Sequence, residues 1–307
     1  MVKYSFLCPG QGSQSVGMAT ELFNEFSCVR ERFALADEIT QRPLSGIIQT
    51  GPMEVLTATE NTQPALFTVE ASIIDVLSKQ NIRPTVAAGH SLGEFSALYA
   101  AGVFSFEDGL RAVTHRGKLM AEAGLVSPGT MAAVIGMDKE VLADTLLRVD
   151  SGIVVTANEN TPEQTVISGD VAAIEDACER CKTAGARRAI RLPVSGAFHS
   201  PLMQGAADEF AEFLATVEFA VPSCPVISNV SAKPENDPVR IKELLLKQLI
   251  SPVRWVETML ELAGMDHGIC LETGPGAVLK GLARNCDKSL NVISCGTATN
   301  IYSLLNN

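Results

Sequence analysis

The pentapeptide Gly89-His90-Ser91-Leu92-Gly93 has the G-x-S-x-G pattern of a nucleophilic serine. It directly follows an apolar run at 85–88 and directly precedes a helical run at 92–101, which is the context that this motif requires. A sharp turn there would expose the Ser91 hydroxyl beside a helix N-terminus, where the Leu92 amide could stabilise an oxyanion. We therefore expect Ser91 to be a catalytic nucleophile; the alternative is a serine that only caps a glycine-rich turn.

A nucleophilic serine needs a general base, and the chain has four histidines, namely His90, His115, His199 and His267. On a strand-to-helix turn the side chain of His90 would point away from Ser91. His115 lies inside a predicted helix, and His267 precedes a predicted strand, where a polar capping role is the default. His199 lies in a loop, residues 194–201, that is expected to cross the cleft of the protein. We therefore expect His199 to be the base.

Two alternatives for this histidine stay open. His199 could merely cap a helix that starts at Pro201. In addition, α/β hydrolases have an Asp or Glu between the serine and the histidine in chain order, and none of the acids there stands in a recognisable strand-end loop. A dyad whose imidazole is oriented by backbone carbonyls is therefore possible as well.

A cation lies on the apolar face of the predicted helix at 105–123. Arg116 recurs at helical spacing with the apolar and small residues of that face, namely Gly109, Ala112, Val113 and Met120. Its guanidinium must be paired, because burying an isolated charge is prohibitively costly. The partner is either a carboxylate of the protein, which helix geometry alone favours, or a substrate carboxylate held by two hydrogen bonds.

The elements that must position these side chains alternate along the chain. Apolar runs at 4–8, 85–89, 268–272 and 291–294 predict strands, and longer helical patterns separate them. Strands that alternate with helices typically pair in parallel through helical crossovers. We therefore expect an α/β fold with a parallel main sheet.

Between Gly129 and Leu192 this alternation changes. Predicted strands at 130–135, 153–157, 165–168 and 187–192, with helices at 138–149 and 170–184, follow the β-α-β-β-α-β order of a ferredoxin-like unit. Turn-forming segments at 124–129 and 193–196 would carry the chain into and out of this unit. The sequence thus predicts a small domain over 128–193, inserted into a large domain over 1–127 and 194–307, with the functional site in the cleft between them.

The composition limits the class of protein. The 307 residues are 46% hydrophobic and 19% charged, which excludes a disordered or fibrous chain. With 24 Lys and Arg against 35 Asp and Glu, the net charge is −11, so neither nucleic acid nor a membrane is an expected partner. No apolar stretch reaches the length of a membrane span, and we expect a cytoplasmic protein.

Two local patterns stand apart from the serine motif. The eight cysteines include one close pair, Cys178 and Cys181, which we interpret as reduced thiols on a helix face and not as a zinc or redox site. Residues 180–191 contain five cations and no acid, namely Arg180, Lys182, Arg187, Arg188 and Arg191. This cluster could bind coenzyme A phosphates or an acidic carrier protein, or it could only protect a solvated strand edge by its charge.

Six ordered blocks of the chain resemble the malonyl-CoA:acyl carrier protein transacylases of fatty-acid and polyketide synthesis. They are Pro9-Gly10-Gln11-Gly12-Ser13-Gln14, Thr62-Gln63-Pro64-Ala65, Gly89-His90-Ser91-Leu92-Gly93-Glu94, Gly196-Ala197-Phe198-His199-Ser200, Gln248 with Ser251-Pro252-Val253-Arg254-Trp255, and Glu272-Thr273-Gly274-Pro275-Gly276. The resemblance covers essentially the whole chain and is far more specific than the serine motif alone. It implies a hydrolase-like α/β large domain that carries a ferredoxin-like small domain.

The resemblance also implies a role for each site residue. Ser91 would accept the acyl group and His199 would be its general base. The backbone amides of Gln11 and Leu92 would form the oxyanion hole. Arg116 would bind the malonyl carboxylate and Gln63 would line the same pocket. Main-chain carbonyls near Gln248 would orient the imidazole, which would explain the missing acid.

By the same resemblance, the protein would transfer a malonyl group from malonyl-CoA to acyl carrier protein through a seryl ester. The coenzyme A thioester would be a substrate. No motif in the sequence indicates a metal or a redox cofactor, so we expect none. Two positions depart from the family pattern: Cys8 stands where Phe is usual, and Gly196 where a related pattern has His. Neither position carries a reacting group, although Cys8 could change the packing under the Gln11 loop.

Phe198 and Leu92 should crowd an α-branched acyl group, so we expect malonyl to be preferred over methylmalonyl. Three other functions are possible. The chain could load the carrier of a polyketide synthase, it could be a serine thioesterase or carboxylesterase, or it could be a non-catalytic docking module for a carrier protein. A hydrolase would need a triad acid and would leave Arg116 without a role.

Overall fold

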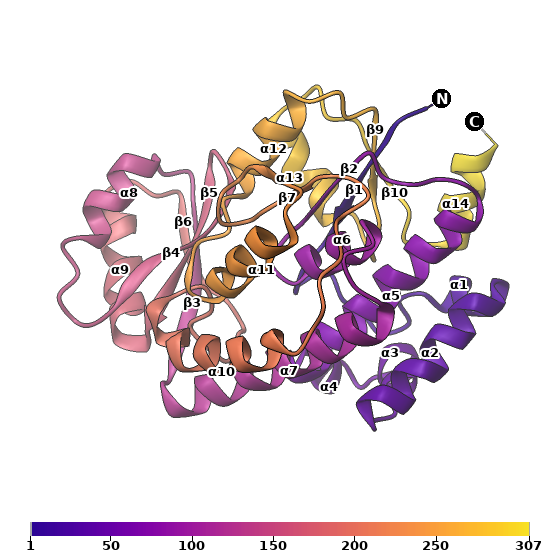
Figure 1. The fold of residues 1–307 in the computed structure, drawn as a ribbon. Coiled ribbons are helices and arrows are strands. Elements are labelled where there is room, and N and C mark those ends of the chain that lie inside the picture. Colours follow the sequence, from indigo (N-terminus) through magenta and orange to yellow (C-terminus); the bar gives the residue numbers. More distant parts are fainter. Residues whose placement is uncertain (1, 307) are drawn as a thin grey trace.

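A computed structural model describes residues 2–306 and contains two sheets that lie side by side (Figure 1). The larger sheet has the strand order β10-β9-β1-β2-β7-β8. Its strands are β1 (Tyr4–Cys8), β2 (Val86–Gly89), β7 (Val226–Ile227), β8 (Pro234–Glu235), β9 (Ile269–Glu272) and β10 (Val292–Ser294). All neighbouring pairs are parallel except β7 and β8. The expected parallel α/β sheet is therefore confirmed.

Helices lie on both faces of this sheet, and further helices pack against those helices. They are α1 (Thr20–Glu25), α2 (Ser27–Thr40), α3 (Leu44–Thr50), α4 (Met53–Thr57), α5 (Thr59–Lys79), α6 (Gly93–Ala100), α7 (Phe106–Val126), α10 (Gln204–Ala215), α11 (Pro238–Lys247), α12 (Trp255–Ala263), α13 (Val278–Cys286) and α14 (Ala298–Leu305). Along β1, Phe6 and Cys8 join the core on the α5 side, whereas Leu7 joins the core on the α12 side. This alternation follows from the two-residue period of a strand whose two faces are both buried.

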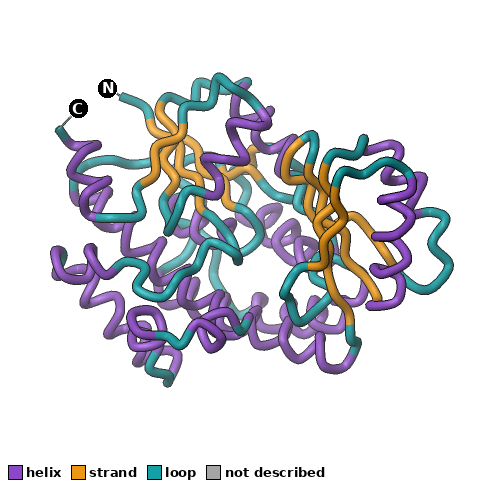
Figure 2. The backbone as a smooth tube through the Cα atoms, turned by 180° about the vertical axis from the view of Figure 1, so that it is seen from behind, coloured by secondary structure: helices purple, strands orange, loops and turns teal. Residues whose placement is uncertain are grey.

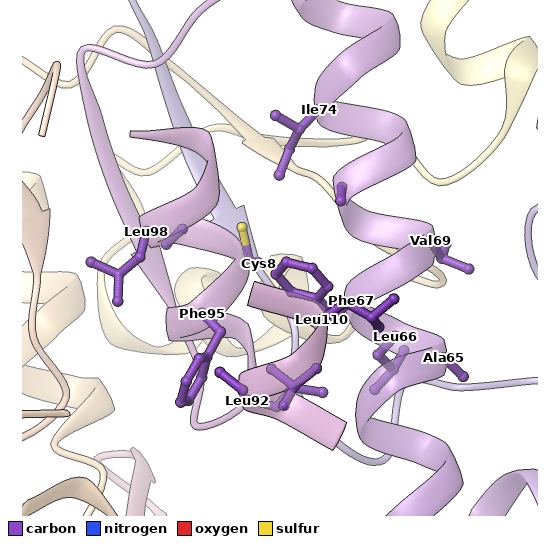
Figure 3. Packing of buried hydrophobic residues seen from close by; sticks show 14 of the residues in the cluster. Cys8, Ala65, Leu66, Phe67, Val69, Ile74, Leu92, Phe95, Leu98 and Leu110 are labelled. Atoms are coloured by element: carbon purple, nitrogen blue, oxygen red, sulfur yellow. The ribbon is translucent and has the colours of Figure 1, made fainter. Parts of the chain in front are cut away.

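The core beside the serine motif lies between α5 and α6. Figure 3 shows Phe67 of α5 near Cys8, with Leu92 and Phe95 at the start of α6. The Cys8 thiol is buried 3.2 Å from the Thr273 hydroxyl, and burial raises its pKa well above the usual value. Cys8 is therefore a core residue under the loop that carries Gln11, as expected from its position.

The second sheet is antiparallel and has the order β4-β5-β3-β6. Its strands are β3 (Gly129–Ile135), β4 (Val154–Thr161), β5 (Gln164–Asp170) and β6 (Arg188–Arg191), and its helices are α8 (Lys139–Leu146) and α9 (Val171–Thr183). Both helices pack against one face, where Ala132, Val134, Ile167 and Ile174 form a separate core. The order of elements is that of a ferredoxin-like unit, so the predicted fold class is confirmed (Figure 2).

Several elements differ from the prediction. Strand β4 runs to Thr161, four residues beyond the expected end, and it contains two register shifts. The helix expected at Pro201 begins as a 3₁₀ turn, η1 (Pro201–Met203), before α10. Strands β7 and β8 were not predicted, because two-residue strands carry too little periodicity to detect. The domain limits at 127/128 and 193/194 stay a prediction.

Backbone hydrogen bonds join the second sheet to the loop at Val253 in the larger unit. In β4, the Glu159 amide donates to the Val253 carbonyl (2.9 Å), and the Val253 amide donates to the Ala157 carbonyl (2.8 Å). Near the chain crossings, a Cβ atom on Gly124 would lie 2.3 Å from the Ser195 oxygen, so the two crossings are tightly packed. The cavity described below opens between the two sheets. Among residues 2–306, no helix combines the length and apolarity that crossing a membrane requires.

Candidate active site

Ser91 lies in a strained turn between β2 and α6. Its φ of 52° is in the left-handed region, which side chains other than that of glycine rarely adopt. The two glycines of the motif allow the close approach of chain segments. A Cβ atom on Gly89 would lie 1.9 Å from the Gly93 carbonyl, and one on Gly93 would lie 2.0 Å from the Cys8 oxygen. The turn therefore needs glycine at both positions and raises Ser91 at the carboxyl end of the sheet.

An asparagine stabilises this turn. The Asn229 Oδ1 atom accepts the Ser91 amide at 2.7 Å, and its Nδ2 atom donates to the Gly89 carbonyl at 2.6 Å. Asn229 follows β7, the strand beside β2, and is completely buried. The side chain thus satisfies two backbone groups that the sharp turn leaves without a secondary-structure partner.

His199 lies against the serine. Its Nε2 atom is 2.7 Å from the Ser91 Oγ atom, and its Nδ1 atom is 2.8 Å from the main-chain oxygen of Gln248. A carbonyl only accepts hydrogen bonds, so Nδ1 carries the proton and Nε2 presents a lone pair to the serine. Burial and the neighbouring Arg116 lower the pKa of His199 to about 3, which keeps the imidazole neutral. Ser200, and not His199, caps the helical turn that starts at Pro201, because the Ser200 hydroxyl accepts the Leu202 amide.

Arg116 lies within reach of the same hydroxyl. It is 1% exposed and donates to the side-chain oxygens of Gln63 (2.8 Å) and Gln248 (2.9 Å) and to the Ser91 Oγ atom (3.2 Å). Its Nε atom is buried without a partner, and burial lowers the pKa of the guanidinium to about 10. The prediction that a carboxylate of the protein pairs with Arg116 is wrong. Within residues 2–306, no Asp or Glu forms an ion pair with Arg116, because the side-chain amides of two glutamines occupy that place.

The amides of Gln11 and Leu92 border the same space. Leu92 directly follows the serine at the N-terminus of α6, and Gln11 follows β1, which is the parallel neighbour of β2. Within the described part of the chain, neither amide donates to another protein group. The two donors are therefore free for an oxygen atom that forms on the serine side.

These residues surround one cavity of about 170 Å³. Its walls come from both units. The larger unit contributes Gln11, Gln63, Ser91, Leu92, Arg116, Phe198 and His199, and the smaller unit contributes Met131, Asn158, Asn160 and Val166. Phe198 and Leu92 contribute apolar walls and are 5% and 1% exposed. The structure thus brings together Ser91, His199, Arg116, Gln11, Leu92, Gln63, Gln248 and Phe198.

The other histidines have different contacts. The His90 Nε2 atom lies 2.8 Å from the Asn160 Oδ1 atom, and its ring packs on Trp255, so it points away from the serine as expected. His115 packs against Phe213. The Nδ1 atom of His267 contacts the Gly268 oxygen near the surface.

The basic cluster lies outside the cavity, on α9, on the edge strand β6 and at Arg187 directly before that strand. Four of its five cations have acidic partners: Arg180 with Asp176, Lys182 with Glu179, Arg187 with Glu163 and Arg191 with Glu175. These carboxylates weaken the positive field that the sequence alone suggests. The assignment of Arg187, Arg188 and Arg191 to carrier or coenzyme A phosphate binding stays a prediction.

Cys178 and Cys181 are buried free thiols on α9. Among the residues that the structure describes, no group of three or more His, Cys, Asp or Glu side chains could hold a metal ion.

Sequence reasoning missed two buried polar residues near the serine. No motif in the sequence around Asn229 indicates that its side chain reaches the turn at Ser91. Glu94 belongs to the G-H-S-x-G-E block, but its contacts could not be foreseen. Its Oε2 atom accepts hydrogen bonds from Gln248 Nε2 (2.5 Å) and from the Asn229 amide (3.3 Å). Burial raises the pKa of Glu94 to about 7, whereas these hydrogen bonds and Arg116 lower it.

Known proteins resemble this chain over nearly its whole length. The model of the acyl transferase domain family matches residues 5–300. The malonyl CoA-acyl carrier protein transacylase of Bacillus subtilis is 43% identical over 296 residues, which cover 96% of this chain and 93% of that protein. An acyl carrier protein S-malonyltransferase from Vibrio cholerae has a solved structure with a TM-score of 0.95 and 41% identity, covering 98% of this chain and 99% of that one. A malonyl-transacylase solved in complex with a type II PKS acyl-carrier protein has a TM-score of 0.95 and 40% identity, covering 99% and 100%.

Proposed function

The chain belongs to the acyl transferase domain family, and from this premise we propose that it transfers a malonyl group from malonyl-CoA to the phosphopantetheine thiol of an acyl carrier protein in fatty acid synthesis. The transfer passes through a malonyl ester of Ser91. This is the activity for which its relatives are named, and the residues around the cavity supply a group for each chemical step.

In the first half-reaction, Ser91 attacks the thioester carbonyl of malonyl-CoA. His199 Nε2 takes the hydroxyl proton as the Oγ–C bond forms, and the Nδ1 hydrogen bond to Gln248 keeps the imidazole in the required tautomer. The Gln11 and Leu92 amides hold the oxyanion, each worth roughly 3 to 4 kcal/mol of barrier. The C–S bond then breaks, and His199 returns its proton to the coenzyme A sulfur.

The second half-reaction reverses these roles. The carrier thiol gives its proton to His199 and attacks the malonyl ester carbonyl. The same two amides stabilise the second oxyanion. The C–Oγ bond breaks, and the proton passes from His199 to Ser91 Oγ. All of these steps use side chains and amides of this protein, and the proposal needs neither a metal nor a redox cofactor.

One observation carries the choice of malonyl. Arg116 is buried, lacks a carboxylate partner among residues 2–306 and lies 3.2 Å from the nucleophilic oxygen. A malonyl group attached to Ser91 brings its free carboxylate to this cation, where charge-assisted hydrogen bonds stabilise it. A hydrolase of neutral esters gains nothing from such a cation, so this feature supports a malonyl transferase over the alternative of a serine esterase.

Intact-protein mass spectrometry after addition of malonyl-CoA tests the proposal. We expect a stable adduct with the mass of one malonyl group on the wild type and none on Ser91→Ala. Addition of a holo acyl carrier protein should then remove the adduct and leave malonyl on the carrier. Malonate release without an adduct would point to a hydrolase, and the absence of both adduct and turnover would point to a docking module.

A second candidate concerns the identity of the carrier. The similarity to a malonyl-transacylase bound to a type II PKS acyl-carrier protein favours a polyketide carrier as an additional acceptor. Competition between a fatty-acid carrier and a polyketide carrier for the malonyl-enzyme distinguishes the two by their relative kcat/KM values. A cytoplasmic location is part of the proposal, and the eight free thiols support it, because disulfides are rare in that compartment.

A further inference from the structure

We propose that Glu94 is a positioning residue that holds the side-chain amide of Gln248 with its oxygen toward Arg116, and that this contact sets the preference for an acyl group with a free carboxylate. The inference rests on the proposed function, because it concerns how the same site selects its substrate. Glu94 itself contacts neither the nucleophile nor the base through its side chain.

The three side chains form a continuous buried series. Arg116 Nη2 donates to Gln248 Oε1 at 2.9 Å, and Gln248 Nε2 donates to Glu94 Oε2 at 2.5 Å. Arg116, Gln248 and Glu94 are 1%, 0% and 3% exposed, so water does not replace these contacts. Each hydrogen bond of the series therefore depends on the one beside it.

The orientation of the Gln248 amide is the central feature of this series. An amide has an accepting end and a donating end, and rotation by 180° exchanges them. The rotated form would place an NH2 group against the guanidinium and an oxygen against the Glu94 carboxylate, so both contacts would be repulsive. Gln248 Nε2 donates one hydrogen to Ser91 O at 3.0 Å and the other to Glu94 Oε2, so these two acceptors together hold the amide in the observed orientation.

The series also explains why Arg116 stays available to a ligand. A carboxylate in direct contact would pair with the cation and compete with the substrate. Glu94 is instead separated from Arg116 by the neutral amide, yet its charge still raises the pKa of the guanidinium against the effect of burial. The cation thus keeps its charge, and its partner on this side is a neutral oxygen that orients the guanidinium without neutralising it.

A set of variants tests the role of Glu94. Glu94→Gln keeps an oxygen that can accept the Gln248 Nε2 hydrogen, whereas Glu94→Ala removes the acceptor. Glu70→Ala is the matched control, because Glu70 is also a fully buried glutamate in the larger unit, but neither of its carboxyl oxygens forms a hydrogen bond with a described residue. The measurements are kcat/KM for acylation of Ser91 by malonyl-CoA and by acetyl-CoA, together with Tm.

We expect Glu94→Ala to lower the ratio of malonyl to acetyl kcat/KM at least about tenfold, because one lost buried charge-assisted hydrogen bond has an effect of this order. Glu94→Gln should retain the wild-type ratio within about threefold, as expected when the acceptor is preserved. Glu70→Ala should lower Tm without changing the ratio. If Glu94→Ala lowers both rates equally, or if Glu94→Gln loses selectivity as Glu94→Ala does, the inference is wrong.

If Glu94→Ala does not fold, Glu94→Asp replaces it, because the shorter side chain withdraws the acceptor from Gln248 and keeps the charge. A tenfold loss of the ratio in Glu94→Asp then supports the inference, and an unchanged ratio overturns it. Failure of the proposed function has a different signature, since the wild type itself would form no malonyl adduct.

Discussion

At the scale of single residues, the site depends on the buried positive charge of Arg116. Arg116 is buried among two glutamine oxygens and the nucleophile, and it has no ion-pair partner within residues 2–306. A buried cation of this kind destabilises the empty protein and becomes favourable when an anion arrives. The residue therefore links substrate selection directly to electrostatics.

Arg116→Gln should weaken the selection of malonyl-CoA over acetyl-CoA. The variant removes the charge and keeps a polar side chain of similar reach, so malonyl loses its partner while acetyl does not. We expect kcat/KM for malonyl-CoA to fall by about 100-fold or more, which corresponds to a hydrogen bond between charged groups, and kcat/KM for acetyl-CoA to stay within about threefold. Acylation rates measured by rapid quench check this, and an equal loss for both thioesters would contradict it.

His199 predicts a pH dependence of stability. Its pKa is about 3 in the folded protein because of burial and Arg116, and the pKa of an unfolded histidine is about 6.5. Below pH 6.5 the unfolded chain takes up a proton that the folded protein refuses, so stability is present above this pH and is lost as pH falls toward 3. At pH 5 the loss is about 2 kcal/mol.

Urea unfolding of the wild type and of His199→Gln at pH 7.5 and pH 5 measures this loss. The free energy of unfolding of the wild type should fall by about 2 kcal/mol more than that of the variant, since every other titrating group is common to both. Parallel changes in the two proteins would show that the imidazole is not held neutral.

At the scale of elements, the turn between β2 and α6 combines strain with close packing. Ser91 has a φ of 52°, and both flanking glycines approach backbone atoms that a side chain would displace. Such a conformation persists only when the surrounding structure holds it in place. Asn229, which follows the neighbouring strand β7, supplies two of the hydrogen bonds that do so.

Asn229→Ala should therefore destabilise the protein by roughly 2 to 4 kcal/mol, because two buried backbone groups lose their partners. It should also lower kcat more than it raises KM, since the turn positions the nucleophile and not the acyl carboxylate. Asn229→Asp is the matched control: it can still accept the Ser91 amide but cannot donate to Gly89, so an intermediate loss is expected. Unchanged urea midpoints in both variants would exclude this role for Asn229.

At the scale of the whole molecule, the cavity exists because two units meet. Ser91, Leu92 and Phe198 come from the larger unit, while Met131 and Val166 come from the second sheet. The backbone hydrogen bonds between β4 and Val253 hold the two walls together beside the cavity. The space for the acyl chain is thus limited on opposite sides by packed side chains.

This confinement predicts selection against a branched acyl group. Malonyl-CoA should acylate Ser91 faster than methylmalonyl-CoA, by about 10-fold or more, because one extra methyl group in a packed pocket costs on the order of 1 to 3 kcal/mol. Phe198→Ala should reduce the ratio of the malonyl to the methylmalonyl acylation rate, because it removes one apolar wall of the cavity. Rapid-quench measurement of Ser91 acylation with each thioester gives this ratio, and equal rates for the wild type would refute the prediction.

The sequence alone determined those features of this protein that local chemistry decides. The strand, turn and helix around Ser91 follow from apolar periodicity and the two glycines, and the order of elements at 129–192 indicates the inserted unit without any contact being known. Arg116 stands out because it interrupts an apolar helix face. Its position in a loop and the family resemblance distinguish His199 from the other three histidines.

Only the tertiary structure decided how these residues meet. It showed that neutral glutamines, and not an Asp or Glu, are the hydrogen-bond partners of Arg116, and it placed the imidazole 2.8 Å from the Gln248 carbonyl that the family resemblance implies. It also revealed that Asn229 binds the Ser91 amide, 138 residues away in the sequence, and that Glu94 binds the side chain of Gln248, 154 residues away. Such contacts leave no periodic trace, because they depend on the packing of distant segments, whereas periodicity records only which face of an element is buried.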